Sequence, residues 1–403
     1  MKKAILNKSN KFVGGGCLAI GLLGGSLFAV NVQASDLSRE QHLGRLLYTD
    51  TTLSLEGNQS CASCHSLDRV RLADGTRFPA PGFVDPVNVT TRAVTSAGSV
   101  AGNFGGLNAP SAGYAAFSPT FYFDDAQGTW IGGQFWNGRA ATLEDQAKGP
   151  FLNPAEMAMP SRWAVISQVK ENAQYVHLFG RVYGFDLDAV PSNPLASSDD
   201  DAPDSVYEAY DLVASAIAAF ERSHVFSKFN SKFDAVQAGR AGFTAQEQAG
   251  MDLFAGKAMC SQCHVMDPAV GPDGKTYPPV FTDFTYDNIG LPRSTSIHGN
   301  PAPDIGLAAT TGDPADAGKH KVMSLRNIEL TAPYGHNGYF LSLEHIVHFY
   351  NTRDVASEGW AAPEVSANVN RTELGNLGLT HEEEHAIVAF LKTLTDGYFE
   401  NDR

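Results

Sequence analysis

The chain has 403 residues, of which 43% are hydrophobic and 18% are charged, and its formal net charge is −15. These proportions are typical of a soluble globular protein with room for two domains of ordinary size. The acidic balance offers no basic patch, which excludes a phosphate-binding or nucleic-acid role. An acidic surface could instead attract a cationic partner protein, or it could serve solubility alone.

The first 34 residues are predicted to be a signal peptide. Lysines at positions 2, 3, 8 and 11 precede the apolar run CLAIGLLGGSLFAV, and the tripeptide VQA then precedes Ser35. This order matches a secretory signal with its cleavage site, and the apolar run is short for a membrane span. We therefore expect a periplasmic protein without stable membrane insertion after cleavage, with an uncleaved anchor as the alternative.

The four cysteines beyond the signal form two pairs of identical spacing. CASCH at 61–65 and CSQCH at 260–264 both match C-x-x-C-H, the attachment pattern of c-type haem. The spacing places both thiolates on one side of a helical turn, and the adjacent histidine then lies beneath the iron. A disulfide or half a zinc site is the alternative, and two such motifs in one exported chain argue against it. The sequence predicts two covalent haems, held by Cys61, Cys64 and His65 and by Cys260, Cys263 and His264.

The segments before the two motifs are predicted to be similar helices. SREQHLGRLLY (38–48) aligns with TAQEQAGMDLF (244–254), and both have an N-cap residue first, glycine at the seventh position and an aromatic residue at the end. This repeat predicts a mainly α fold of two cytochrome c-like domains, each binding one covalent haem, with long loops. We place the N-terminal domain at residues 35–235 and the C-terminal domain at 236–403.

Further helices are predicted from apolar periodicity at 160–172, 206–223 and 381–396. The segment 190–205 is rich in Pro, Ser and Asp and is predicted to be a loop, and 108–124 is expected to hold a short strand or an extended loop. HEEEH at 381–385 also fits the H-E-x-x-H pattern of zinc metalloproteases. We reject that site because Thr380 is a predicted N-cap, which leaves both histidines in an exposed first turn.

Three longer motifs resemble those of one family. QFWNGRAATLEDQAKGPFLNPAEM (134–157), SLRNIELTAPYGHNG (324–338) and LGRLLYTDTTLS with GNQSCASCH (43–65) look like segments of the bacterial di-haem cytochrome c peroxidases and MauG. The resemblance covers nearly the whole mature chain. It implies an oxidoreductase that uses H2O2, with a peroxide-cleaving first haem and an electron-transferring second haem.

The resemblance also implies roles for individual residues. Glu156 and Gln146 match the distal carboxylate and amide above the first haem. A glutamate there can take the proton from H2O2 and return it to the leaving oxygen, while the amide holds peroxide or water. Trp136 matches the tryptophan between the two haems, where an indole can pass electrons; ordinary core packing is its alternative.

A calcium site between the domains is implied in the same way. Asn108 matches the asparagine that binds Ca2+, and Thr331 and Pro333 match two residues that offer backbone carbonyl oxygens. Such oxygen atoms are the ligands that Ca2+ prefers. Ala109 and Ser111 depart slightly from the family's usual flanking residues.

One departure from the family concerns the first haem. Conventional members carry a histidine in the loop after the first CxxCH, which caps the iron at rest. Here no histidine occurs between His65 and His177, and the matching position lies near Val100 in the long loop 66–107. We therefore expect an open or water-bound sixth position that needs no reductive activation.

A second departure concerns the sixth ligand of the second haem. Conventional members use a methionine fourteen residues after the histidine of the HxG motif, and the same count from His336 gives Tyr350. Helical periodicity puts Tyr350 on one face with Leu343 and Val347, and MauG-type enzymes carry tyrosine here. A phenolate is a hard anionic ligand that favours higher iron oxidation states than a thioether does. A packed core tyrosine is the alternative.

The predicted function is therefore MauG-like oxidation of a partner protein, at an oxidisable Trp or Tyr, with H2O2. The alternative is a conventional peroxidase whose electrons come from a small cytochrome c or a cupredoxin. A non-enzymatic di-haem electron carrier is a third hypothesis, and Glu156 and the missing histidine argue against it.

Overall fold

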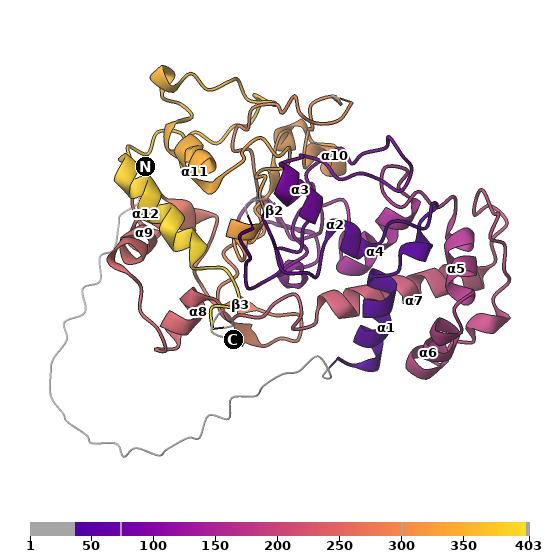
Figure 1. Ribbon diagram of the computed structural model, residues 1–403. Helices are drawn as coiled ribbons and strands as arrows, with labels where there is room; N and C mark the ends of the chain where they lie inside the picture. The colour runs from indigo at the N-terminus through magenta and orange to yellow at the C-terminus, as the bar shows by residue number, and fades with distance from the viewer. Residues whose placement is uncertain (1–36, 73–74, 300, 400–403) are drawn as a thin grey trace, which may run out of the picture. The chain divides into compact units, whose positions relative to one another are not determined.

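The computed structural model describes residues 37–72, 75–299 and 301–399, and the predicted signal peptide at 1–34 lies outside them. Helices and long loops make up most of this part of the chain, as expected, and the strands are short (Figure 1). The helices are α1 (Arg39–Tyr48), α2 (Cys61–Cys64), α3 (Pro86–Thr91), α4 (Leu143–Leu152), α5 (Arg162–Lys170), α6 (Ala173–Tyr183), α7 (Asp204–Glu221), α8 (Lys232–Gln237), α9 (Ala245–Ala255), α10 (Ala308–Thr311), α11 (Leu343–Thr352) and α12 (His381–Lys392).

The strands form antiparallel two-stranded ribbons. β1 (Tyr122–Asp124) pairs with β2 (Thr129–Ile131), β3 (Ala269–Val270) with β4 (Thr276–Tyr277), and β5 (Tyr286–Asp287) with β6 (His320–Lys321). β1 lies inside the segment 108–124, where a short strand was one of the two expectations. Such short ribbons cannot form a core of their own. They hold loops in place and do not form a layer of the fold.

Side-chain caps start the helices that precede or flank the cysteine motifs. The Ser38 hydroxyl accepts a hydrogen bond from the amide of Gln41, and the Gln41 side chain accepts one from the amide of Ser38. α9 begins with the same reciprocal pair at Thr244, and α12 begins with one at Thr380. A capping residue of this kind is worth about 0.5–2 kcal/mol. The three predicted N-caps are confirmed.

Two helix crossings repeat along the chain. α1 packs against α7, and α9 packs against α12. A Cβ atom at Gly44 would collide with the backbone carbonyl of Ala216, and one at Gly250 would collide with that of Ala386. Each crossing therefore requires glycine, because only hydrogen at that position lets the two backbones approach so closely.

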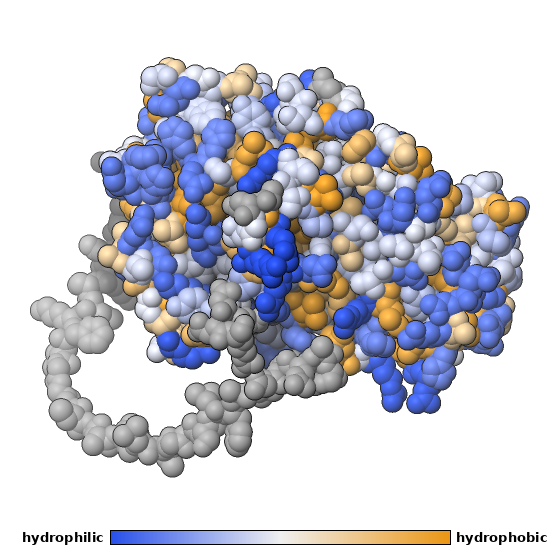
Figure 2. All heavy atoms as spheres, in the orientation of Figure 1, coloured by the Kyte–Doolittle hydropathy of each residue, from blue (hydrophilic) through white to orange (hydrophobic). Residues whose placement is uncertain are grey.

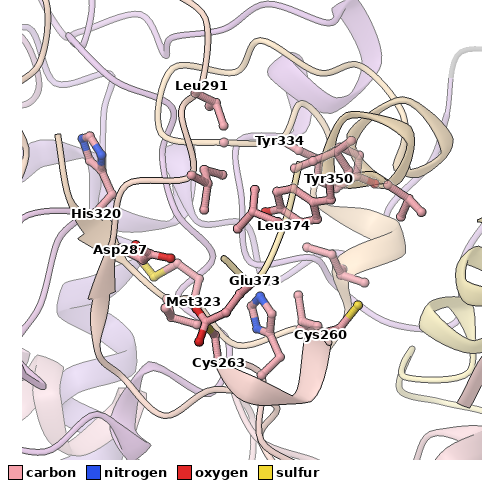
Figure 3. A pocket seen from close by; sticks show the side chains of 18 of the residues that line it. Cys260, Cys263, Asp287, Leu291, His320, Met323, Tyr334, Tyr350, Glu373 and Leu374 are labelled. Atoms are coloured by element: carbon pink, nitrogen blue, oxygen red, sulfur yellow. The ribbon is translucent and has the colours of Figure 1, made fainter. Parts of the chain in front are cut away.

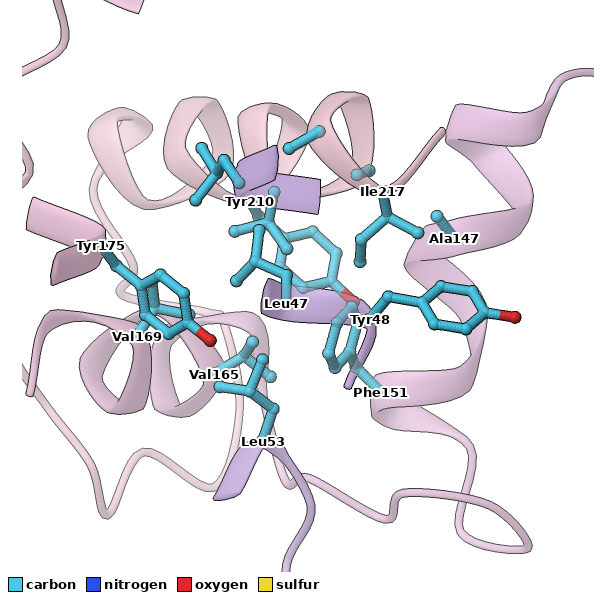
Figure 4. Packing of buried hydrophobic residues seen from close by; sticks show 14 of the residues in the cluster. Leu47, Tyr48, Leu53, Ala147, Phe151, Val165, Val169, Tyr175, Tyr210 and Ile217 are labelled. Carbon is cyan, nitrogen blue, oxygen red and sulfur yellow. The ribbon is translucent and has the colours of Figure 1, made fainter. Parts of the chain in front are cut away.

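Two hydrophobic clusters form beside these crossings. The first draws on residues between 37 and 226, and the second on residues between 233 and 394. Figure 4 shows part of the first cluster, where Leu47 of α1, Val165 of α5 and Tyr210 of α7 converge. Full burial of each large apolar side chain contributes about 1.5–3 kcal/mol. The clusters hold the helices that carry the cysteine motifs.

The described residues from Leu37 onward form one compact unit. A smaller cluster packs Tyr114 and Phe117 against Val280, and the Tyr114 hydroxyl donates to both carboxylate oxygens of Asp396 at 2.9 and 3.0 Å. The two halves are therefore joined by buried contacts. The boundary between residues 235 and 236 stays a prediction.

Hydrophilic and hydrophobic residues are interspersed on the face shown in Figure 2. Within the described ranges, none of the helices combines the length and the apolar composition needed to cross a membrane.

Candidate haem sites

The first CxxCH motif lines a cavity that is partly open to solvent. α2 carries Cys61 and Cys64, and His65 follows at its C-terminus. Ser60 precedes the helix as N-cap, and the amide of His65 donates to the carbonyl oxygen of Cys61 at 2.8 Å. This one helical turn brings both thiols and the imidazole to the same cavity.

His65 has the environment of a metal ligand. Its Nδ1 lies 3.3 Å from the carbonyl oxygen of Phe83 and donates to it, which leaves Nε2 available for a metal. Burial lowers the pKa of the imidazole, so the neutral form prevails near pH 7. Among the described residues that line this cavity, His65 is the only histidine. Val100, at the position of the family's capping histidine, does not line it.

Glu156 and Gln146 line the same cavity as His65. Gln146 belongs to α4, and Glu156 lies in the turn that follows this helix, where its Oε1 accepts a hydrogen bond from Asn153 Nδ2 at 2.7 Å. Burial raises the pKa of Glu156, while the Asn153 hydrogen bond and the charge of Arg139 lower it. A carboxyl group balanced in this way can both accept and return a proton.

The lining of the first cavity fits a covalent haem. Two thiols and a neutral imidazole stand together, and most of the remaining lining is apolar, as a porphyrin requires. Arg139 also lines the cavity, and its guanidinium lies 3.5 Å from the centre of the Phe135 ring. No ion pair joins Arg139 to a carboxylate within the described part of the chain. The guanidinium group of Arg139 is therefore available to pair with an acidic substituent of a haem.

The second motif lines a second cavity, which is again partly open to solvent. The short 3-10 helix η5 (Cys260–Gln262) is followed by Cys263 and His264, and the amide of His264 donates to the Cys260 carbonyl oxygen at 2.9 Å. Nδ1 of His264 donates to the carbonyl oxygen of Phe281 at 2.9 Å. Burial lowers the pKa of His264 to about 4. The local geometry therefore repeats that of the first motif.

Tyr350 of α11 lines the second cavity, and Figure 3 shows it across the cavity from Cys260 and Cys263. Its hydroxyl group has no hydrogen-bond partner among the described residues. Burial raises the pKa of Tyr350, and nearby Cys260, Cys263 and Asp287 raise it further. The phenol therefore keeps its proton unless a cation replaces it, which fits a ligand position for iron.

Other potential sixth ligands are less suitably placed. Met259 directly precedes Cys260, and Met323 lines the cavity beside the imidazole of His264, so both belong to the attachment side. Met266 does not line the cavity. His348 donates from Nδ1 to the Glu384 carboxylate at 2.9 Å and lies outside the cavity lining.

A buried lysine provides a second test of fit. Lys321 is 6% exposed, lines the second cavity, and donates to the carbonyl oxygen of Gly133 at 2.6 Å. Burial lowers its pKa to about 7, and no carboxylate in the described ranges forms an ion pair with it. A buried amine without an anion is costly. A carboxylate group of a haem in this cavity would neutralise it.

Trp136 lines both cavities. Its indole Nε1 donates to the carbonyl oxygen of Asn108 at 2.8 Å, and its own carbonyl oxygen accepts from the amide of Lys321 at 2.8 Å. The ring is thus fixed by the Asn108 bond, and the Lys321 bond fixes the backbone of Trp136, so the residue is tied to both halves of the chain.

Two of the three residues predicted to bind calcium, Asn108 and Pro333, lie in direct contact. Asn108 is buried, and its side-chain amide donates to the carbonyl oxygens of Pro333 at 2.7 Å and Gly335 at 3.3 Å. The nitrogen and oxygen of such an amide are interchangeable by a half-turn. The turned amide would present its oxygen beside these carbonyl oxygens, a set that fits a hard cation.

Two other potential metal-binding groups do not form independent sites. His381 and His385 are exposed in the first turn of α12, and their Nε2 atoms lie 2.9 Å apart, as expected for a surface helix start. Cys263 also lies close to Asp287 and Glu373. Because Cys263 belongs to the CxxCH motif, this group is part of the second cavity.

Several residues of the two cavities were not singled out from the sequence. Arg139 and Asn153 lie inside the quoted 134–157 motif and could have been found there. Glu221 falls on the apolar face of its helix, where a charged residue is unusual. Lys321 has no local signal, because nothing in the sequence around it indicates burial.

Comparisons with known proteins agree with this geometry. A family model described as di-haem cytochrome c peroxidase matches residues 38–242. The methylamine utilization protein MauG of Paracoccus denitrificans (strain Pd 1222) is 37% identical over 376 residues, covering 89% of this chain and 89% of that protein. The cytochrome c551 peroxidase of Nitrosomonas europaea is 31% identical, covering 91% and 82%.

A solved structure is similar over the same region. The crystal structure of the diheme peroxidase BthA from Burkholderia thailandensis E264 matches with a TM-score of 0.71 and 28% sequence identity, covering 89% of this chain and 86% of that one. With both CxxCH motifs on cavities that fit haem, this chain belongs to the di-haem cytochrome c peroxidase family of haem-dependent oxidoreductases.

Proposed function

We propose that this chain is a MauG-like oxidoreductase that uses H2O2 to oxidise a partner protein. The observation that carries the proposal is the Tyr350 hydroxyl, which faces the second cavity without a hydrogen-bond partner among the described residues. By resemblance, its position matches that of the methionine in conventional members of the family. A tyrosinate ligand favours higher oxidation states of iron than a thioether does. The second site could therefore retain an oxidising equivalent until a partner side chain supplies an electron.

Proton transfer in the first cavity is assigned to Glu156. Haem bound there through Cys61, Cys64 and His65 would supply the iron that activates H2O2. Glu156 takes a proton from one oxygen of H2O2 and returns it to the other, so that water leaves. The 2.7 Å hydrogen bond from Asn153 orients the carboxylate, and the Gln146 amide holds the substrate or a water beside it.

Electron transfer between the sites is assigned to Trp136. Its indole is in contact with both cavities and is held by the Asn108 carbonyl. In the second cavity, His264 and Tyr350 would hold the iron of a haem, and Lys321 would pair with a haem carboxylate. The chain thus supplies a proton-transfer group at one site and a tyrosine ligand at the other.

The proposal is tested by adding one equivalent of H2O2 to the purified oxidised protein. We expect a long-lived oxidised state that decays by oxidising an aromatic side chain of an added protein, with slow turnover of reduced cytochrome c. Rapid consumption of reduced cytochrome c would instead support the conventional peroxidase. No reaction with H2O2 would refute both.

The conventional peroxidase remains the second candidate because the same first cavity, with Glu156, would serve it. The net charge of −15 suits a small basic cytochrome c as electron donor, and a cupredoxin could take the same role. Measurements at several salt concentrations test for such a donor. If charge attracts the donor, its association rate falls as ionic strength rises.

We also propose that Ca2+ binds between the halves of the chain, at Asn108 and the carbonyl oxygens of Thr331 and Pro333. The proximity of the Asn108 amide to the Pro333 carbonyl supports this assignment. Metal analysis of the purified protein, with an Asn108→Leu variant for comparison, tests it.

Export to the periplasm is proposed from the sequence of residues 1–34. N-terminal sequencing of the mature protein should find Ser35 as its first residue. We further propose that the mature chain comprises two haem-binding domains that meet near residue 235, in agreement with the separate hydrophobic clusters on either side.

A further inference from the structure

The two helix crossings align residue by residue. Gly44 meets Ala216 and Phe220 in the first crossing, and Gly250 meets Ala386 and Phe390 in the second, with the same 2.9 Å from the glycine's ideal Cβ to the phenylalanine Cβ. The residues that directly follow Phe220 on α7 and Phe390 on α12 therefore occupy equivalent positions. In the second half of the chain that residue is Leu391, and in the first half it is Glu221.

Both equivalent residues line the cavity of their own CxxCH motif. Leu391 lines the second cavity, together with Ile387, and Glu221 lines the first, together with Ile217. The second cavity shows that this position can hold an apolar residue without loss of the crossing. A carboxyl group at Glu221 is therefore not required by the fold.

The Glu221 carboxyl group is buried without a complete set of partners. The residue is 6% exposed, and its Oε2 is the one buried side-chain nitrogen or oxygen of the described chain that has no hydrogen-bond partner. An unsatisfied buried polar group costs about 1–3 kcal/mol. The protein keeps this unfavourable group on the wall of a cavity. A group kept there at such a cost is expected to act on something inside the cavity.

The surrounding groups do not neutralise Glu221. Arg222, next to it on α7, forms a two-pronged ion pair with Glu144 of α4 at 2.5 and 2.9 Å. The hydroxyl of Tyr48 on α1 donates to the carbonyl oxygen of His65. Glu156 lies on the wall of the same cavity. The remaining titratable neighbour, Cys61, would become a thioether when haem is attached.

We propose that Glu221 is a carboxylic acid that delivers protons to the first cavity during peroxide reduction. The overall step is H2O2 + 2 H+ + 2 e− → 2 H2O, in which the O–O bond breaks and two O–H bonds form. The electrons come from the partner protein, so this inference rests on the proposed function. Glu156 moves a proton between the two oxygens of H2O2, and Glu221 passes a further proton from solvent into the cavity.

The proton affinity of Glu221 agrees with this role. Burial raises its pKa to about 8, and the positive charge of Arg222 does not reverse that shift. The acid therefore holds its proton at neutral pH and can recover it from solvent after each transfer.

The test compares the haem-loaded wild type with Glu221→Gln and Glu221→Leu, the latter copying Leu391. We expect turnover with H2O2 to fall at least about tenfold in both variants. The wild-type rate should decline as pH rises through about 8, where Glu221 loses its proton, and the variants should lack this decline. Glu208→Gln, an exposed acid on the same helix, is the matched control and should behave as wild type.

Two readouts are independent of activity. The wild type should show an infrared carbonyl band of a buried carboxylic acid that disappears above pH 8 and is absent from Glu221→Gln. Because the folded pKa exceeds the unfolded one, the stability from this group is present at low pH and is lost as pH rises through about 8. The unfolding temperature of the wild type should therefore fall, relative to Glu221→Gln, over that range.

The outcomes separate the two proposals. A wild type that does not reduce H2O2 overturns the proposed function and this inference with it. A wild type that reduces H2O2, with both variants equal to it in rate and pH profile, overturns only the role of Glu221. If the leucine variant does not load haem, the glutamine variant and the wild-type infrared band decide.

Discussion

Replacing Glu156 with glutamine isolates its role as a base. Glutamine has nearly the same shape and keeps an oxygen that can accept the 2.7 Å hydrogen bond from Asn153. The Asn153 donor therefore keeps its acceptor, the loss of which would cost about 1–3 kcal/mol. The change should therefore remove proton transfer and little else.

The expected loss follows from the chemistry of a positioned base. General acid–base catalysis contributes about 10²–10⁴-fold, so the rate of reaction with H2O2 should fall by that factor, or about 3–5 kcal/mol of barrier. Stopped-flow absorbance of the haem-loaded protein mixed with H2O2 measures this rate. Glu171→Gln, an exposed acid at the end of α5, is the control.

The pH profile gives an independent check on the same carboxyl group. The base is the ionised form, so the rate should fall as pH decreases through the pKa of Glu156, which burial has raised. Asn153→Ala removes a hydrogen bond that lowers this pKa, so the acidic limb should move to higher pH. A Glu156→Gln rate equal to that of the wild type would refute the assignment, whatever the pH profile.

Three further predictions concern the rest of the molecule. Tyr350→Met should keep both haems attached but abolish the long-lived oxidised state after one equivalent of H2O2; survival of that state in the absorbance trace would show that the ligand assignment is wrong. Gly44→Ala forces α1 away from Ala216 and should lower the free energy of unfolding by about 1–3 kcal/mol in denaturant titrations. Gly180→Ala in α6, where a Cβ meets nothing within 4 Å, should instead be neutral or stabilising by up to about 1 kcal/mol, and equal losses in the two would exclude the steric explanation. Chelation of Ca2+ should lower the unfolding temperature of the wild type but not of Asn108→Leu.

The local features of the two sites could be predicted from the sequence. A CxxCH motif spans five residues, and its geometry depends on a single turn, so Cys61, Cys64 and His65 meet wherever that turn forms. N-caps are equally local, because Ser38 and Thr244 bond to an amide three residues ahead. The helices that begin at these caps, and the presence of two attachment motifs, therefore needed no knowledge of distant contacts.

The positions of Glu156 and Tyr350 were predicted through resemblance to a family rather than from local physics. Their sequence neighbourhoods do not specify a cavity, and a solvated turn or an ordinary core tyrosine would have satisfied the same pattern. Packing of α4 and α11 decides that these side chains line the cavities of His65 and His264.

The cavity walls themselves depend on contacts between distant segments. Trp136 lines both cavities only because the halves of the chain pack together, and Lys321 is buried for the same reason. The equivalence of Glu221 and Leu391 follows from the contacts of Gly44 and Gly250 in the two helix crossings, which join segments far apart in the sequence. Sequence periodicity assigns a residue to a helix face, but only tertiary packing determines whether that face meets an apolar core or a site of chemistry.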